Sequence, residues 1–313
     1  MIGAIVMTDE KRGIVLTVFT YMIWGMLPIF WKQVEHVPAD ELLAARIVFA
    51  FILTMLLIIT LGGGKQWIAD IKSLWRDKKK FFTLMLASLF ISGNWFLYIY
   101  AVTNDHIVET SLGYYINPLI SMLIGAVVLK EKLSPSIKVS FVLAAVGVTI
   151  LTISYGSLPW LAIGMATTFA IYGYIKKTIQ LNALRGLAIE TLFVLPIAIG
   201  YYVYLFVDGR AAIGHTGLST DFMLVVSGAA TALPLWLFAI AAPLIPLYVV
   251  GFLQYIAPTL MLIIGVFLYG EAFGAIDLLS FSLIWAALIL FTGTKVVEAR
   301  KRYKDKRSAL RGK

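Results

Sequence analysis

The chain has 313 residues and a formal net charge of +9, with 60% hydrophobic and only 14% charged residues. A soluble domain is about half apolar and about a quarter charged, so this composition excludes an ordinary soluble protein and indicates a polytopic membrane protein. Cysteine is absent, which excludes disulfides, thiolate catalysis and cysteine–metal sites.

Ten apolar segments are long enough to cross a bilayer, because about 20 helical residues span roughly 30 Å of hydrocarbon. We expect these segments at 13–32, 41–61, 81–102, 108–129, 138–154, 158–175, 187–206, 222–241, 248–269 and 276–296. The sequence therefore predicts an all-α polytopic membrane protein with ten transmembrane helices.

Lysine and arginine are distributed unevenly between the loops. Of the 26 such residues, 23 fall in the N-terminus, in alternate loops and after the last segment, and only Lys32, Arg46 and Arg210 fall elsewhere. By the positive-inside rule, both termini and the basic loops are cytoplasmic. The basic tail is better explained by contact with anionic lipid at that face of the bilayer than by nucleic-acid binding, so we expect no nucleic-acid partner.

The first three segments carry side chains suited to a ligand. Trp24 and Trp95 lie deeper than an interfacial belt of tryptophans would. Arg46 lies near the external end of the second segment, where its guanidinium either binds an anion or carboxylate or snorkels to the interface. Asn94 and Tyr98 are four residues apart, hence on one helix face, and Asn94 either bonds another helix or contacts substrate.

The fourth and ninth segments repeat each other. Ser111–Glu131 and Gly251–Glu271 align at a constant offset of 140. The identical positions are Tyr115/Tyr255, Ile116/Ile256, Pro118/Pro258, Ile124/Ile264, Gly125/Gly265 and Glu131/Glu271. Because a helix interior normally excludes proline, we expect both helices to be interrupted, and corresponding interrupted helices indicate the binding site of a transporter.

Polar side chains stand just before each proline. They are Tyr114, Tyr115 and Asn117 before Pro118, and Gln254 and Tyr255 before Pro258. They either satisfy carbonyl groups that the proline leaves free, or they face a ligand. We expect Pro118 and Pro258 to shape moving helices, and Gly125 and Gly265 to let helices approach closely.

The offset of 140 maps the fourth segment onto the ninth, so the repeating unit has five helices and the two halves have opposite orientations. We expect a cytoplasmic N-terminus at 1–12, a first repeat at 13–154, a second repeat at 158–297 and a basic cytoplasmic tail at 298–313. Inverted repeats provide a structural basis for alternating access.

Glu190 lies near the cytoplasmic end of the seventh segment, at a place nearly equivalent to that of Arg46. It is a candidate for gating or proton coupling, and the alternative is a structural contact at a helix end. The three histidines His36, His106 and His215 fall in predicted external loops, so no intramembrane histidine relay is visible. Metalloprotease, nucleotide-binding and serine-hydrolase motifs are missing, so we expect no enzyme activity, cofactor or metal.

Six stretches resemble the RarD-type branch of the EamA family in the drug/metabolite transporter superfamily. They are WGMLPIFWK at 24–32, NWFLYIYAV at 94–102, SLGYYINPLISMLIG at 111–125, GLAIETLFVLP at 186–196, TALPLWLFAIAA at 231–242 and GFLQYIAP at 251–258. The resemblance implies ten helices in two inverted repeats and movement of a small organic molecule across the bacterial inner membrane. RarD-type sequences often have a histidine before the arginine of the second segment, whereas this chain has Ala45.

We therefore expect a secondary transporter, specifically an exporter of small metabolites or drug-like molecules. The expected lining combines Arg46 with the deep tryptophans, Asn94, Tyr98 and the polar residues before the two prolines. Two alternatives remain: a membrane receptor or assembly partner without transport, and an enzyme acting on lipid-linked substrates. The substrate, the coupling ion and a homodimer are left open.

Overall fold

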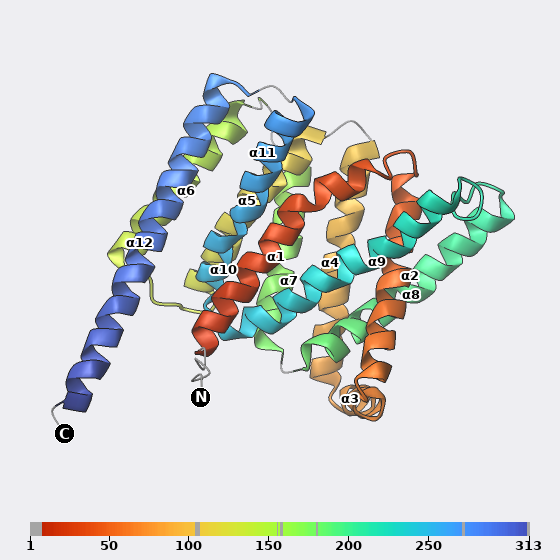
Figure 1. Ribbon diagram of the computed structural model, residues 1–313, viewed down its shortest axis with the longest axis horizontal. Helices are drawn as coiled ribbons and strands as arrows, with labels where there is room; N and C mark the ends of the chain where they lie inside the picture. The colour runs from red at the N-terminus through yellow and green to blue at the C-terminus, as the bar shows by residue number, and fades with distance from the viewer. Residues whose placement is uncertain are drawn as a thin grey trace, which may run out of the picture.

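The computed structural model describes residues 8–103, 107–154, 156, 159–179, 181–270 and 273–311, and all regular structure within them is helical. Figure 1 shows the arrangement of the helices. They are α1 (Asp9–Lys32), α2 (Ala39–Thr60), α3 (Gly64–Arg76), α4 (Lys78–Thr103), α5 (Ile107–Val127), α6 (Pro135–Ser154), α7 (Trp160–Thr178), α8 (Ala183–Val207), α9 (Leu218–Ala241), the 3-10 turn η1 (Ala242–Leu244), α10 (Leu247–Gln254), α11 (Ile256–Tyr269) and α12 (Ala275–Arg311).

Within the described residues, eight helical stretches are long and apolar enough to cross a membrane. They lie in α1, α2, α4, α6, α8, in α9 with η1, in α10 with α11, and in α12. The prediction of an all-α polytopic membrane protein is confirmed. The count of ten spans stays a prediction, because the apolar stretch in α5 is shorter, Leu112–Val127, and α7 ends in Lys176 and Lys177.

Helix α3 lies in a segment that the sequence assigns to a loop. Its Leu74 is 3% exposed, and Trp67 packs against a small cluster with Ile58 and Leu184. Arg185 Nε lies 2.5 Å from Asp70 Oδ2, which ties α3 to the start of α8. Length and apolar composition do not predict this helix, because it has one apolar face on an otherwise basic segment and is too polar to cross a membrane.

Only one of the two expected helix interruptions is present. The ninth segment breaks at Tyr255 into α10 and α11, whereas α5 continues through Pro118. Pro258 has no N–H to donate to the carbonyl of Gln254, four residues earlier, so the helix loses a bond at the break. At the break itself, the Tyr255 N–H donates to the Phe252 carbonyl at 3.3 Å, which is the tighter pattern of a 3-10 turn.

Helices from the two halves of the chain are packed against each other. Helix α1 packs on α9 and α11, α7 packs on α4 and α5, and the pairs α2–α8, α5–α10 and α6–α12 cross between halves. Small residues allow these contacts: a Cβ on Gly251 would lie 2.8 Å from the Pro118 carbonyl oxygen.

The start of α1 and the end of α12 lie at the same end of the bundle (Figure 1). We call this end, with the start of α1, with α3 and with the end of α12, the N-terminal face. The opposite end, where α1 and α11 finish and α12 begins, is the distal face.

Candidate functional site

A cavity of about 540 Å³ lies between α1, α2, α4, α5, α7, α9, α10 and α11. Nine of the residues that the sequence singles out line it: Trp24, Arg46, Asn94, Trp95, Tyr98, Tyr114, Asn117, Gln254 and Pro258. The structure thus brings together residues that lie more than 200 positions apart in the sequence. The cavity is of the size that drug-sized ligands occupy.

The cavity reaches the distal face. Lys32 and Glu35 stand at its rim, where their side chains are 53% and 60% exposed and form an ion pair of 2.5 Å. Tyr269, at the end of α11, completes this rim, and the Lys32 ammonium lies 6.0 Å from the centre of its ring. A solute that enters from the distal side therefore passes the Lys32–Glu35 ion pair before it reaches the interior of the cavity.

Arg46 is held inside the cavity by contacts from three other helices. Its Nε donates to Thr231 Oγ1 on α9 at 2.9 Å. The guanidinium carbon lies 4.8 Å from the ring centre of Trp31 and 5.1 Å from that of Trp95, which are cation–π distances. Across the described residues, none of the ion pairs involves Arg46. The sequence singles out Arg46 but does not show Thr231 as its partner.

Asn94 joins α4 to α7. Its Nδ2 donates to the Met165 carbonyl at 2.7 Å and to Thr168 Oγ1 at 3.2 Å. This is the helix–helix contact that the sequence leaves open as one alternative, although the residue also borders the cavity. Tyr98, one turn further along the same helix, lines the cavity as well.

The residues before the two prolines divide between the cavity and the helix interfaces. Tyr114, Asn117 and Gln254 line the cavity, and Gln254 Oε1 is buried without a hydrogen-bond partner in the described structure. Tyr115 and Tyr255 do not line it, contrary to expectation. Successive residues on a helix point about 100° apart, so when Tyr114 faces the cavity its neighbour faces another helix. Tyr115 packs edge-on against Phe281 of α12, with ring centres 5.0 Å apart, and Tyr255 is 1% exposed.

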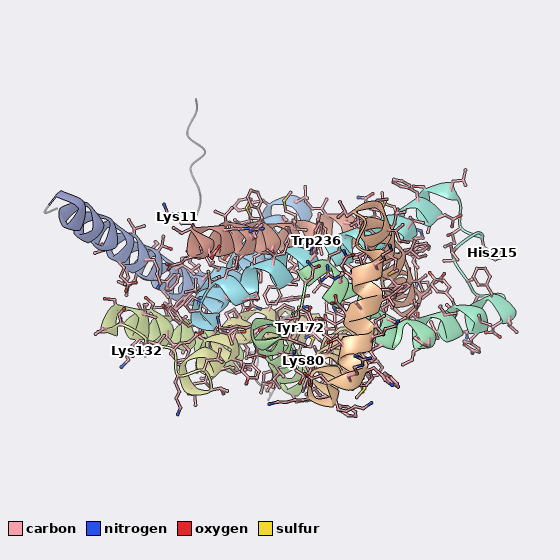
Figure 2. All side chains as sticks on the ribbon, turned by 90° about the horizontal axis from the view of Figure 1, so that it is seen from below. Lys11, Lys80, Lys132, Tyr172, His215 and Trp236 are labelled. Atoms are coloured by element: carbon pink, nitrogen blue, oxygen red, sulfur yellow. The ribbon has the colours of Figure 1, made fainter. Side chains whose placement is uncertain are left out.

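Aromatic side chains close the cavity toward the N-terminal face. The Trp24 ring lies 5.5 Å from Phe169 and 5.9 Å from Phe238, and Phe238 stacks on Tyr172 at 6.1 Å. We call Tyr21, Trp24, Phe169, Tyr172 and Phe238 the aromatic floor. Seen from below, Tyr172 lies inside the bundle, whereas Lys132 and His215 lie at its two sides (Figure 2). The sequence identifies only Trp24 of this floor as a ligand candidate, because aromatic residues are common throughout the chain.

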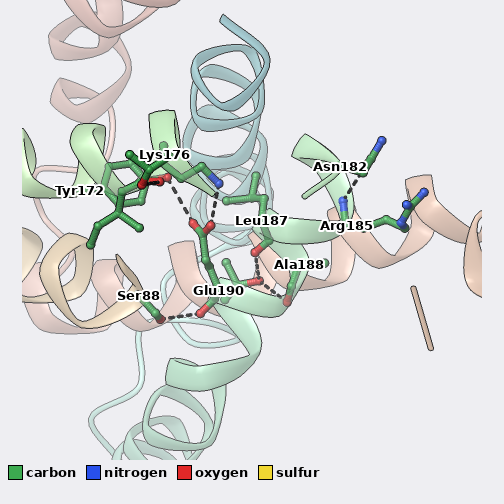
Figure 3. Close-up of polar contacts among 11 residues, drawn as sticks. Ser88, Tyr172, Lys176, Asn182, Arg185, Leu187, Ala188 and Glu190 are labelled. Carbon is green, nitrogen blue, oxygen red and sulfur yellow. Dashed lines mark hydrogen bonds and ion pairs between the residues drawn. The ribbon is translucent and has the colours of Figure 1, made fainter. Parts of the chain in front are cut away.

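A buried ion pair lies next to Tyr172 of the aromatic floor (Figure 3). Lys176 Nζ is 2.6 Å from Glu190 Oε1, and their side chains are only 4% and 2% exposed. The Tyr172 hydroxyl donates to Glu190 Oε2 at 3.3 Å, and Ser88 Oγ donates to the Glu190 backbone carbonyl at 2.6 Å. The predicted sixth segment, 158–175, stops just before Lys176, whereas the structure places this residue in the last turn of α7 with its side chain buried. Glu190 lies outside the cavity lining.

Glu131 binds the first backbone N–H groups of α10 at the N-terminal face. Its carboxylate accepts from the backbone N–H groups of Leu247 at 2.7 Å and Tyr248 at 3.0 Å, and Lys177 Nζ lies 3.7 Å away. Lys177 also donates to the Ile245 carbonyl. A Cβ on Gly125 would lie 2.5 Å from Glu131 Oε2, so the glycine leaves room for this carboxylate.

The remaining gating candidates do not line the cavity. Pro118 packs where α5 crosses α10, and Gly265 is buried in α11, where its carbonyl accepts from the N–H of Gly270. Glu271, the repeat partner of Glu131, and His106 lie outside the described residues. No group of three or more His, Asp or Glu residues that can hold a metal is found in the described part of the chain.

Comparison with known proteins identifies full-length relatives. The EamA-like transporter family matches residues 11–153. The chain is 43% identical to a Bacillus subtilis (strain 168) protein named uncharacterized transporter YojE, over 92% of this chain and 96% of that protein. It is 39% identical to Protein RarD of Salmonella typhi, over 94% of this chain and 99% of that protein. It is 37% identical to Protein RarD of Escherichia coli (strain K12), over 94% and 98% respectively.

A solved crystal structure of a protein that is 17% identical matches with a TM-score of 0.69, over 90% of this chain and 96% of that chain. At that identity the match shows a shared fold and nothing about function. The relatives, by contrast, are 37% to 43% identical over nearly their whole length, and the names of the family and of YojE are those of transporters. The chain is therefore a multi-pass membrane protein that belongs to the EamA-like transporter family, in its RarD-type branch.

Proposed function

We propose that the chain is a secondary transporter, working as an exporter, that carries small organic molecules across the bacterial inner membrane by alternating access. The observation that carries this proposal is the cavity of about 540 Å³, which reaches the distal face but is closed toward the N-terminal face. The closure consists of the aromatic floor, the buried Lys176–Glu190 pair and the Glu131 contacts with α10. The structure then corresponds to the state that is open on the distal side.

An inverted repeat of 13–154 and 158–297 supplies the second state. Equivalent helices make equivalent contacts: α1 packs on α9 and α11, as α7 packs on α4 and α5. The same holds for side chains. Arg46 on α2 bonds Thr231 on α9, and Glu190 on α8 bonds Ser88 on α4 through its backbone carbonyl. Exchanging the conformations of the two halves would close the region of Arg46 and open that of Glu190.

The distribution of basic residues supports the orientation of this transporter. We assign the N-terminal face to the cytoplasm, with both termini there and with anionic lipid around the basic tail at 298–313. In this orientation the cavity opens to the outside. Glu190 is proposed as part of the cytoplasmic gate rather than as a proton carrier, because it is paired with Lys176 and lies next to Tyr172 of the aromatic floor.

Filling the cavity tests the proposal. Met261 lines the cavity and is partly buried, whereas Ile263 on the same helix is 44% exposed on the outer surface. Purified protein is reconstituted into proteoliposomes, and uptake of a panel of radiolabelled organic acids, amino acids, amines and sugars is measured. We expect Met261→Trp to lower uptake at least tenfold and Ile263→Trp to transport as the wild type does.

Two results would contradict the proposal. If no compound of the panel entered wild-type proteoliposomes faster than empty ones, the chain would be a receptor or assembly partner instead. If Met261→Trp transported as fast as Ile263→Trp, any transport would run by another route than this cavity. Gel filtration of both variants checks that each remains folded and monodisperse.

A further inference from the structure

We infer that the substrate is an organic monocarboxylate, with its carboxylate on Arg46 and its apolar body against the aromatic side chains of the cavity. This inference rests on the proposed transport function and names the chemical class that the same cavity selects.

The interior of the cavity carries one uncompensated positive charge. Among the described lining residues, the only charged side chains are Lys32, Glu35 and Arg46. Lys32 and Glu35 neutralise each other at the exposed rim. Arg46 lies deeper, and its partners in the described structure are a hydroxyl and two aromatic rings, none of which carries a negative charge. A charge within the membrane that lacks a counter-charge is unfavourable, so an anion entering the cavity gains by pairing with it.

The groups around Arg46 suit a carboxylate. Because Nε is engaged by Thr231 and the rings of Trp31 and Trp95 flank the guanidinium, the two Nη groups remain for a planar, bidentate acceptor. Tyr98 and Tyr114 lie near enough to interact electrostatically with Arg46, and both border the cavity. Their hydroxyl groups can each donate a further hydrogen bond to a carboxylate oxygen.

Because the cavity interior carries a single positive charge, it also restricts the charge that a ligand can have. A phosphate monoester carries about 1.5 to 2 negative charges at neutral pH and would leave part of that charge unpaired. A zwitterionic amino acid brings an ammonium group, but the described interior lining offers no carboxylate to receive it. The body of the ligand meets Trp24, Phe169 and Met261, with the amide of Gln254 as a polar contact. A monocarboxylate with an aromatic or aliphatic body satisfies all of these groups.

Closure of the distal side also favours a bound carboxylate. In the closed N-terminal half, Glu190 is neutralised by Lys176, which follows Tyr172 by four residues. Trp24-Gly25 in α1 corresponds to Tyr172-Gly173 in α7, and the residue four positions after Trp24 is Pro28, which carries no charge. When the distal half closes around Arg46, α1 therefore supplies no counter-charge at the equivalent place. A bound carboxylate supplies it, so closure with substrate is favoured over closure of the empty cavity.

The test compares each acid with its own neutral amide on the wild-type protein. The probes are 3-phenylpropionate and indole-3-acetate, the corresponding amides, phenylalanine, tryptamine and phenyl phosphate. Binding to detergent-purified protein in chloride-free buffer is measured by calorimetric titration and by the shift in Tm. We expect the two monocarboxylates to bind at least tenfold more tightly than their amides, phenylalanine, tryptamine and phenyl phosphate.

Variants then assign the difference to Arg46. Arg46→Gln should bind acid and amide equally, and Arg46→Lys should keep a preference for the acid that is smaller than in the wild type, since an ammonium lacks the planar fork. Arg210→Gln is the control, because Arg210 lies in the distal loop beside Asp208 and not in the cavity. It should bind as the wild type does.

The inference is overturned if wild-type protein binds the amides as tightly as the acids, if it binds none of the acids, or if Arg46→Gln retains the preference. The comparison of acid with amide on the wild type holds even where a variant fails to fold. Failure of the inference is distinguishable from failure of the proposed function, because neutral or cationic compounds that enter wild-type but not Met261→Trp proteoliposomes would still establish transport.

Discussion

Alanine in place of Glu190 is expected to lower the free energy of unfolding by about 3–5 kcal/mol, the range for breaking a buried ion pair from one side. Lys176 is only 4% exposed and would lose the carboxylate that lies 2.6 Å from its Nζ. The Tyr172 hydroxyl would lose its acceptor at the same time. The bond from Ser88 goes to the backbone carbonyl and survives the substitution, so the loss reports on the side chain alone. Thermal and denaturant unfolding in detergent measure the change.

Two further variants separate pairing from packing. Because replacing both members of a buried pair with apolar residues is often neutral or stabilising, Lys176→Met with Glu190→Leu should recover most of the stability. Lys80→Ala removes a pair with Asp77 of 3.6 Å whose side chains are 52% and 41% exposed, and it should change the unfolding free energy by at most about 1 kcal/mol. A Glu190→Ala protein as stable as Lys80→Ala would show that the pair contributes nothing to closing this half.

Alanine in place of Glu131 is the second substitution with a large expected effect. Its carboxylate accepts from two backbone N–H groups at the start of α10, which have no intrahelical partner. A hydrogen bond to a charged group contributes about 1.5–3 kcal/mol, so we expect a loss of about 3–6 kcal/mol for the two together. Lys177, which is 3.7 Å from Glu131, would lose its carboxylate as well. The same unfolding measurement applies.

Graded substitutions test whether the carboxylate is responsible. Glu131→Gln keeps one acceptor oxygen without charge and should fall between Glu131→Ala and the wild type. Lys132→Ala, the next residue and an exposed one, should leave stability unchanged within about 0.5 kcal/mol. Equal stability of Glu131→Ala and Lys132→Ala would mean that α10 does not depend on this contact for its position.

The fold can be predicted largely from the sequence because the bilayer restricts what can cross it. A spanning segment has to satisfy its backbone groups internally, so length and apolar composition suffice to identify helices such as α2 and α6. The amphipathic helix α3 does not cross the membrane, so length and apolar composition do not identify it. The positions of helix breaks are harder to predict from the sequence: Pro118 and Pro258 occupy equivalent places, but α5 is continuous and only α10 and α11 are separate helices.

Site residues could be predicted from the sequence only where a polar or charged side chain stands in an otherwise apolar membrane segment. Arg46, Asn94 and Gln254 are polar residues in apolar segments and stand out for that reason. Which of two adjacent tyrosines faces the cavity, Tyr114 or Tyr115, depends on the rotation of α5, and a helix that is apolar on every side gives no periodic signal for it. Lys176 was missed as a partner of Glu190 because a lysine at a helix end is normally solvated.

The most direct test of alternating access uses single cysteines, which can be introduced without further changes because the chain has none of its own. Met261 lines the cavity, and Ser121, 140 positions earlier and so its repeat equivalent, is 3% exposed in the closed half. Each of Met261→Cys and Ser121→Cys is labelled with a membrane-impermeant maleimide from either side of the membrane.

We predict that Met261→Cys reacts only from the distal face and Ser121→Cys only from the N-terminal face. A transported ligand should change the two labelling rates in opposite directions. Labelling of either cysteine from both faces would indicate a continuous channel. A Ser121→Cys protein that reacts from neither face, with or without ligand, would contradict transport through this cavity.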